Sequence, residues 1–257
     1  MVCAKQTFDT EAVIALTADG QVNATGITLI IDPYSEFAVE QAIQMKEKDG
    51  GEVIVLTIGN AGAQSAIRHA LAMGADSGVL VDDPAIAGGD SLATALILAK
   101  ALEKLNPDII LGGFKSSDIA GAQVLPRVSS ILNLPNVNVA THLEWADGKA
   151  QVTRELDDGV EIIEVALPAI IGAQQGLAEP RYPSVKGIMQ SKKKPINTWT
   201  LADIGVDAGA VGAGAAKTKV VQYTLKEARK GGRIIEGEVP DVTKEVVQLT
   251  RTEAKVI

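Results

Sequence analysis

Short apolar runs rich in valine and isoleucine alternate with stretches of helical periodicity over residues 1–135. Such runs are typical of strands buried on both faces, and the stretches between them are typical of the helices that cover a sheet. The expected strands lie at 1–4, 53–58, 78–81 and 108–111, and the expected helices at 33–48, 63–73, 91–105 and 121–132. This rhythm predicts an α/β fold with a parallel, Rossmann-like sheet and helices on both faces.

Two of these helices carry end signals of their own. Asp32 followed by Pro33 predicts a helix start, with the aspartate as N-cap and the proline as first residue. The turn-forming residues 49–51 predict its end, and Gly74 occupies the C-cap position of the next helix.

The pattern changes after Val137. Three short runs joined by Asp-Gly turns predict an antiparallel meander, inserted at about 137–167. Its strands are expected at 141–145, 151–155 and 161–167, and the apolar run 165–171 predicts a further buried strand.

The C-terminal part has a different composition. Residues 201–216 are rich in glycine and alanine, which predicts a linker, and residues 217–257 predict an extended arm with one helix around 244–249. We therefore expect one domain over 1–200, followed by this linker and this arm.

Charge and cysteine content exclude several classes of function. A formal net charge of −8 argues against nucleic-acid binding, which needs a basic surface. The single cysteine, Cys3, excludes an internal disulfide and a cysteine-based metal site, and the two histidines stand far apart, so we expect no metal. No apolar run approaches the roughly 18 residues of a membrane span, and no secretory signal is apparent. These features predict a cytoplasmic protein that does not span a membrane.

The segment 176–195 departs abruptly from the buried strand before it. Pro180 and Pro183 favour an extended chain, and a short helical pattern follows over 184–191. Its apolar members are Val185, Ile188 and Met189, and three lysines end it. So short a helix gains little order from local packing. The pattern alone favours a turn packed on its own domain over a protruding docking helix.

A second segment suggests a ligand site. Ligands of open parallel sheets bind at the carboxyl ends of the strands, here near Cys3, Ile58-Gly59 and residues 111–113. Small residues over 112–124 lead from a strand into a helix, and free N–H groups at such a junction favour a phosphate. On the pattern alone, a phosphate site and an ordinary strand-to-helix turn stay equally open.

Four motifs resemble those of the β subunit of electron-transfer flavoproteins. They are Lys5–Thr10, Ile31–Tyr34, Ala70–Asp76, and Glu179-Pro-Arg-Tyr182 with Ile188-Met189 and Lys192-Lys-Lys194. They occur in order from residue 1 to about residue 200, so the resemblance covers most of the chain.

The resemblance implies an adenine nucleotide α-hydrolase-like domain that carries electrons and has no catalytic residue of its own. It implies an FAD shared with a larger α subunit, with the segment from Phe8 to Thr10 nearest to the flavin. The electron donors would be acyl-CoA dehydrogenase-type flavoenzymes, as in fatty acid oxidation, and the acceptor a membrane quinone oxidoreductase. The protein would bind the flavin and tune it.

The resemblance also implies a nucleotide site and a docking anchor. The site holds AMP in the common type of the family and a second FAD in the electron-bifurcating type, which uses NADH. Asp32 stands where the family more often has asparagine. The docking residues are Val185, Ile188 and Met189, with Val185 as the anchor. The cofactor-binding residues carried over are Cys3, Phe8, Thr10, Asp32, Ile58, Gly59, Gly113, Asp118, Ile119, Ala120, Gly121, Ala122, Gln123 and Val124.

Several alternatives stay open. The loop 118–124 lacks the second acid and the threonine of bifurcating relatives, which favours AMP, whereas 88–94 resembles a segment of bifurcating members. A stand-alone adenine-nucleotide-binding regulator of the universal-stress type would share the sheet architecture without needing a docking helix. An enzyme acting at the nucleotide phosphate would have only Lys115 and Asp118 as candidates.

Overall fold

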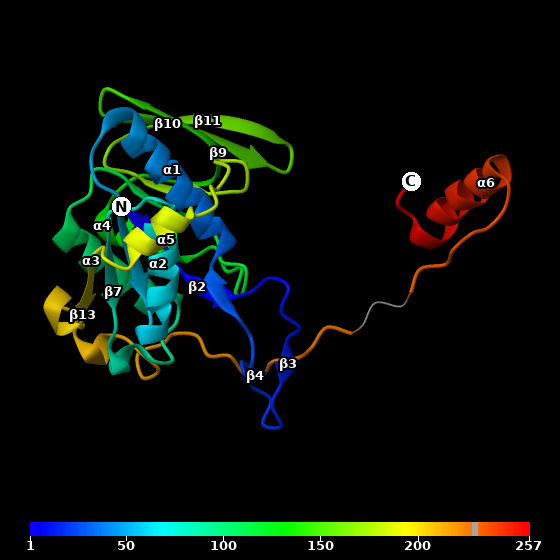
Figure 1. Cartoon of the computed structure of the whole chain (residues 1–257). Coiled ribbons are helices and arrows are strands. Elements are labelled where there is room, and N and C mark those ends of the chain that lie inside the picture. The colour runs from blue at the N-terminus through cyan, green and yellow to red at the C-terminus, as the bar shows by residue number, and fades with distance from the viewer. Residues whose placement is uncertain (228–230) are drawn as a thin grey trace. The chain divides into compact units, whose positions relative to one another are not determined.

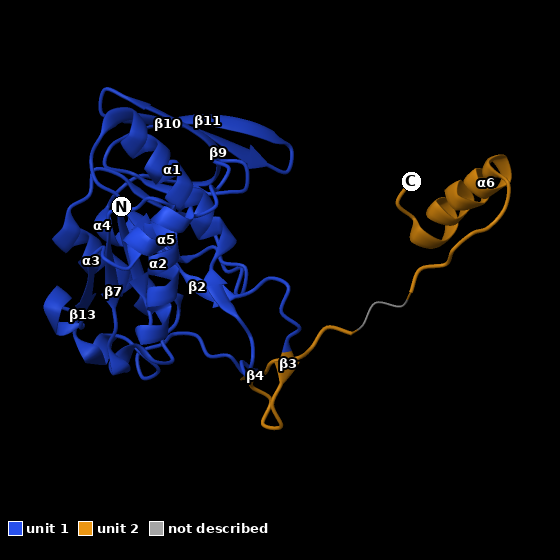
Figure 2. Cartoon of the chain, in the orientation of Figure 1, with its two compact units in different colours: residues 1–14, 23–221 blue, residues 15–22, 222–257 orange. Residues whose placement is uncertain are grey.

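A computed structural model describes residues 1–227 and 231–257, which form two compact units (Figure 2). The first unit comprises residues 1–14 and 23–221, and the second comprises residues 15–22 and 222–257. Three residues of the expected C-terminal arm, 228–230, lie outside the described residues.

A nine-stranded sheet forms the centre of the first unit (Figure 1). Seven neighbouring strands pair in parallel, and two further strands add an antiparallel meander at one edge. The predicted fold class is therefore confirmed. In order across the sheet the strands are β11 (Gly159–Ala166), β10 (Lys149–Leu156), β9 (Asn136–Ala146), β12 (Ile170–Ala173), β8 (Ile110–Gly113), β1 (Val2–Cys3), β6 (Ile54–Ile58), β7 (Ser77–Val81) and β13 (Ile196–Trp199).

Helices cover both faces of this sheet. The helices α1 (Pro33–Asp49) and α2 (Gln64–Met73) pack on one face, and α3 (Ser91–Leu105) and α4 (Val124–Leu132) pack on the other. Successive strand residues point to opposite faces, so Ile110 lies in the α3–α4 core and Leu111 in the α1–α2 core. Burial on both faces explains why the strands are continuous apolar runs.

Helix α1 starts where its capping signal predicts, whereas α4 starts later than expected. The Asp32 carboxylate accepts the Tyr34 N–H at 3.1 Å, and Pro33 is the first residue of α1. Helix α4 begins at Val124 rather than at 121, because Ala120 and Ala122 have φ of 53° and 50°, which no α-helix accommodates.

The predicted strand 165–171 is divided in the structure. Strand β11 ends at Ala166 and β12 begins at Ile170. Pro168, between them, has no N–H to contribute to a ladder, which explains the interruption.

The glycine-rich stretch 201–216 belongs to the first unit and packs closely against the rest of it. It holds the 3₁₀ turns η3 (Ala202–Ile204) and η4 (Ala208–Ala210), and its Leu201, Ile204 and Val211 are buried. At Gly212 an added Cβ would overlap the carbonyl oxygen of Ala85, in the turn η2 (Pro84–Ile86). The small glycine and alanine residues, which predict a linker, here let the backbone of this stretch approach the backbone of η2 closely.

The remaining elements are short. Strands β2 (Gln6–Phe8) and β5 (Leu29–Ile31) pair antiparallel, as a two-stranded sheet, and β3 (Ala15–Leu16) pairs with β4 (Val22–Asn23). The second unit includes α6 (Val239–Leu249) and a π-helical turn (Thr250–Ala254), so its helix is longer than the one expected around 244–249. Within the described parts of the chain, every helix is too short or too polar to cross a membrane.

Candidate functional site

The carboxyl end of β1 is the point where the chain reverses its direction across the sheet. Strand β1 pairs with β6 on one side and with β8 on the other, so the chain runs from β1 through β6 and β7 in one direction and continues with β8 on the opposite side of β1. A crevice forms at such a point, outside the carboxyl ends of the strands. The register places Cys3 beside Leu56 and Gly112, and the loop 114–123 follows directly.

The buried carboxylate of Asp32 connects this loop to the start of α1. One carboxylate oxygen of Asp32 caps α1, and the other accepts the Ser117 N–H at 2.7 Å. The Ser117 hydroxyl is 3.4 Å from that of Thr7, on β2. Burial raises the pKa of Asp32, and the hydrogen bonds from Ser117 and Ser35 oppose this rise. Asp32 therefore ties the loop to the start of α1.

An ion pair holds the loop from the side. The Lys5 ammonium donates to both oxygens of Asp118, at 2.6 and 2.7 Å, and to the Ser116 hydroxyl at 3.2 Å. Burial raises the pKa of Asp118, but the hydrogen bonds from Lys5 and Ser116 outweigh it and lower the pKa overall. Asp118 is thus a charged anchor of the loop, and Lys5 adds a cation at the mouth of the crevice.

The free end of the loop turns its N–H groups outward. Left-handed Ala120 and Ala122 are followed by right-handed Gln123, an alternation that directs successive N–H groups toward one concave face. Among the residues that the structure describes, the N–H groups of 121–124 donate no hydrogen bond. Left-handed backbone costs about 1 kcal/mol for each alanine. The arrangement suits an anion, because these N–H groups also lie at the positive end of α4.

Neighbouring side chains fix the position of this end. The Gln123 amide oxygen accepts from the Ser91 hydroxyl at 3.1 Å and from Arg127 at 2.9 Å. Asp90, the N-cap of α3, receives the N–H groups of Leu92 and Ala93 on one oxygen. The strained loop is therefore supported by the starts of two helices.

Glycine is required where β8 enters the loop. An added Cβ on Gly113 would lie 2.7 Å from the Tyr34 Cβ and 2.9 Å from the Lys115 carbonyl oxygen. The Tyr34 ring packs edge-on against Phe114, with centroids 5.1 Å apart, and the Lys115 ammonium lies 5.2 Å from the Tyr34 ring centre. Gly113 thus lets the loop pass close to Tyr34, and two aromatic rings lie beside its first residues.

The second site is the segment after β12, whose near end is clamped to α1. The Arg181 guanidinium donates two hydrogen bonds of 2.8 Å to Glu40 and one of 2.6 Å to Glu47. The Glu40 side chain is only 3% exposed. Burial raises the pKa of Glu40, but hydrogen bonds from Arg181 and Gln44 outweigh it, so the pKa is lowered. A planar guanidinium suits this bidentate arrangement better than an ammonium does.

Two cations clamp the far end to α2. Arg68 donates to the carbonyl oxygens of Ser191 and, at 2.8 Å, Lys194. The Lys194 ammonium donates to the carbonyl oxygens of Leu71 and Ala75, which lie at the end of α2. Of the three consecutive lysines, Lys194 is therefore structural, and only Lys192 and Lys193 are exposed.

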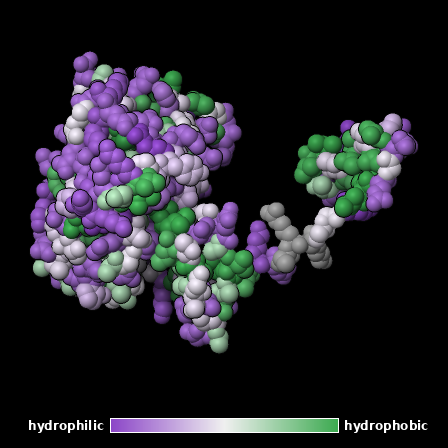
Figure 3. All heavy atoms as spheres, viewed as in Figure 1, coloured by the Kyte–Doolittle hydropathy of each residue, from purple (hydrophilic) through white to green (hydrophobic). Residues whose placement is uncertain are grey.

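The clamped segment carries the helix α5 (Val185–Ser191) directly on α2. An added Cβ on Gly187 would overlap the Ala72 carbonyl oxygen, so this close contact needs glycine. On α5 the apolar Val185 and Met189 side chains are 76% and 65% exposed, and Ile188 is 48% exposed beside α2. In Figure 3 apolar (green) side chains over α5 interrupt a hydrophilic surface. Exposed apolar groups held on a fixed segment make α5 a candidate interaction site.

Comparison with known proteins identifies the family. A family profile described as "Electron transfer flavoprotein domain" matches residues 19–204. The chain is 49% identical to the electron transfer flavoprotein subunit beta of Syntrophomonas wolfei, over 94% of this chain and 91% of that protein. It is 38% identical to the subunit of the same name from Bacillus subtilis, over 100% and 98% of the two chains. The chain belongs to the electron transfer flavoprotein family, as a β subunit.

A third relative of this β subunit carries a different name. The chain is 37% identical to the caffeyl-CoA reductase-Etf complex subunit CarD of Acetobacterium woodii, over 92% of this chain and 91% of that protein. Members of the electron transfer flavoprotein family that resemble this chain thus include a subunit of a CoA-thioester reductase complex.

The structure brings most of the predicted cofactor-binding residues of this β subunit to one edge. Cys3, Ile58 and Gly59 lie at or just beyond the ends of β1 and β6, and Gly113 ends β8. Phe8, in β2, and the exposed Thr10 continue the chain beyond this edge. Burial raises the pKa of the Cys3 thiol to about 12, so it stays protonated at neutral pH. Asp32 lies at the start of α1, hydrogen-bonded to Ser117, and the remaining predicted residues form the loop 118–124 described above.

Sequence reasoning missed several residues that build these sites. Lys5 was visible as part of a motif, and Ser116-Ser117 as a polar pair in a small-residue loop, but their contacts with Asp118 and Asp32 depend on the fold. The Glu40 partner of Arg181 is 141 residues away in the sequence. No local signal identifies such a pair.

Proposed function

We propose that this β subunit pairs with an electron transfer flavoprotein α subunit and helps to enclose an FAD held mainly by that subunit. The flavin supplies the redox chemistry, and the two chains bind it, orient it and tune its electronics. Phe8 and Thr10, beyond the carboxyl edge, are proposed as the residues of this chain nearest to the flavin. The chain itself then acts as an electron carrier in the cytoplasm, without catalytic residues.

The crevice at the end of β8 is proposed to bind AMP. The observation that carries this assignment is the row of N–H groups over 121–124, held outward by two left-handed alanines. Such N–H groups suit a phosphate. The adenosine part is assigned to Cys3, Asp32 and Ile58. Both oxygens of Asp32 are engaged with backbone N–H groups, so we assign its ligand contact to the backbone or to the loop that it holds.

A second FAD in the same crevice is the alternative. One specific observation favours it. The segment 88–94 resembles a segment of bifurcating members, and its Ser91 hydroxyl donates a hydrogen bond to Gln123 of the nucleotide loop. A β subunit of this second type would use NADH as a reactant.

The helix α5 is proposed as the docking site for the electron donor, with Val185 as the anchor and Ile188 and Met189 beside it. Its exposed apolar side chains on a rigid support favour a small interface in which one residue dominates. The donor is proposed to be an acyl-CoA dehydrogenase-type flavoenzyme, the partner that the family resemblance implies. The acceptor is proposed to be a membrane quinone oxidoreductase.

The experiment that tests the proposal is to purify the β subunit with its α partner, denature it, and quantify the released nucleotides. One FAD and one AMP per heterodimer are expected. Two FAD without AMP would replace the AMP assignment by the second flavin. A chain that purifies as a monomer with adenine nucleotide and without an α partner would favour the stand-alone regulator instead.

A further inference from the structure

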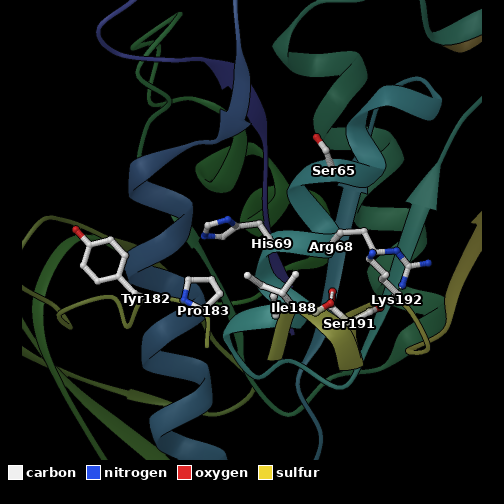
Figure 4. A pocket seen from close by; sticks show the side chains of 9 residues that line it. Ser65, Arg68, His69, Tyr182, Pro183, Ile188, Ser191 and Lys192 are labelled. Carbon is white, nitrogen blue, oxygen red and sulfur yellow. Dashed lines mark hydrogen bonds between the residues drawn. The ribbon is translucent and has the colours of Figure 1, made fainter. Parts of the chain in front are cut away.

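A groove lies beside α5, between the docking segment and α2 (Figure 4). Its volume is about 660 Å³, within the range of roughly 300–1,000 Å³ that is usual for ligand pockets. One wall is formed by α2 and the other by the docking segment. The lining residues are Ser65, Arg68, His69, Ala72, Tyr182, Pro183, Ile188, Ser191 and Lys192.

The walls of this groove are fixed before any partner arrives. Arg181 clamps the segment just before Tyr182 to α1, and Arg68 and Lys194 clamp its far end to α2. Gly187 seats α5 against α2 between these clamps. A preformed groove costs little ordering entropy when a side chain enters it.

The groove is apolar inside and basic at its rim. Ala72, Pro183 and Ile188 supply apolar surface, and Arg68 and Lys192 supply positive charge. The His69 ring is 2.7 Å from Glu36, so that carboxylate faces the imidazole. Lys192 is exposed and takes part in none of the ion pairs found within 1–227 and 231–257. The rim is therefore locally basic on a chain whose net charge is −8.

We propose that this groove receives an apolar side chain carried on an acidic segment of the electron-donating dehydrogenase. This inference rests on the docking function proposed for α5. Docking is then reciprocal: Val185 enters the partner, and a side chain of the partner enters the groove behind it. The occupant is a protein rather than a small molecule, because the groove shares Ile188 with the exposed apolar face of α5 and its basic rim complements acidic side chains.

Filling the groove tests this proposal. Ser65→Tyr adds a ring on the α2 wall and leaves α5 untouched, while Ala61→Tyr adds the same ring at an exposed site outside the groove. Each variant β subunit is purified with its α partner, and its FAD content and unfolding midpoint are checked. A purified acyl-CoA dehydrogenase from the same organism then reduces the heterodimer. We expect Ser65→Tyr to raise the KM for the dehydrogenase about tenfold with kcat unchanged, because the variant weakens binding of the dehydrogenase equally before and during electron transfer. Ala61→Tyr is expected to match the wild type.

Reversing the charge at the rim of the groove gives an independent test of the proposal. Lys192→Glu is expected to raise the same KM about tenfold at low salt, an effect that shrinks as salt screens it. Lys193→Glu makes the same change in net charge one residue outside the groove and is expected to have less than a third of that effect.

The outcomes separate the groove from the docking function. If Ser65→Tyr and Lys192→Glu behave like their controls while Val185→Asp abolishes electron transfer, the groove proposal is overturned and the docking helix stands. If Val185→Asp also transfers electrons normally, or if the wild-type heterodimer accepts no electrons from the dehydrogenase, the docking function itself is wrong.

Discussion

The nucleotide loop over 113–124 and the docking segment over 176–195 are both surface segments that follow buried strands, but they are held in opposite ways. The side chains of Asp32 and Lys5 hold the nucleotide loop, and within the described residues the N–H groups of 121–124 at its end donate no hydrogen bond. Ion pairs of Arg181 and hydrogen bonds from Arg68 and Lys194 to backbone carbonyl oxygens hold the docking segment, and its apolar side chains stay exposed. In each case the groups that the fold leaves unpaired indicate the ligand: an anion for one, an apolar protein surface for the other.

The largest effect is expected from breaking the nucleotide loop alone. Ala122→Pro forces φ to about −65° where the structure has 50°, and it removes one of the free N–H groups. Losing one or two hydrogen bonds to a charged ligand, at about 1.5–3 kcal/mol each, predicts roughly a hundredfold weaker AMP binding. AMP retained by the purified heterodimer is the measurement. Ala122→Gly keeps both the N–H and the left-handed backbone and is expected to retain AMP.

A second variant breaks the clamp of the docking segment. Arg181→Met leaves the nearly buried Glu40 without its partner, which is expected to cost about 2–4 kcal/mol in the free energy of unfolding. Glu47→Gln removes the exposed partner of the same arginine and should cost less than about 1 kcal/mol. Urea unfolding of the two variant heterodimers measures this difference, and equal losses would show that the buried carboxylate is not the critical member.

The smallest effect concerns Asp90, whose carboxylate caps α3 and accepts the N–H groups of Lys217 and Thr218 at the start of the arm. Hydrogen bonds from Ala93, and further ones from Lys217, Thr218 and Leu92, lower the pKa of Asp90 to about 2. A carboxyl whose folded pKa is depressed stabilises the fold above its ordinary pKa of 3.8, and this stabilisation is lost as the pH falls toward 2.

We therefore expect Asp90→Ala to cost about 1 kcal/mol at neutral pH, the usual value of a lost helix cap, and to weaken the pH dependence of stability between about 2 and 4. Unfolding midpoints across this pH range measure it. An unchanged pH profile would mean that the carboxylate is replaceable at this position.

The sheet was predictable, because strands buried on both faces leave continuous apolar runs and their covering helices leave periodic ones. The start of α4 was not predictable, because alanine normally favours helix and nothing local signals the left-handed Ala120 and Ala122. The packing of 201–216 was hidden for a similar reason: glycine marks both flexible chain and close backbone contact, and only the fold distinguishes them.

The candidate sites divide in the same way. The motifs around Lys5, Asp118 and Arg181 indicated where the sites lie. What these residues do depends on partners far away in the sequence, such as Asp32 for Ser117, 85 residues apart. Sequence therefore singles out the two candidate regions, and the structure shows which of their groups lack partners among the described residues.

The most direct test of this account is a single experiment on the Val185→Asp heterodimer, beside the wild type and Lys193→Glu as a charge-changing control on the same segment. Flavin reduction by the dehydrogenase and the content of FAD and AMP are measured on the same preparation. The account predicts at least a hundredfold slower reduction with unchanged FAD and AMP, because a buried charge at the anchor abolishes docking and leaves the nucleotide loop intact. Normal reduction, or loss of nucleotide together with electron transfer, would contradict the separation of the two regions.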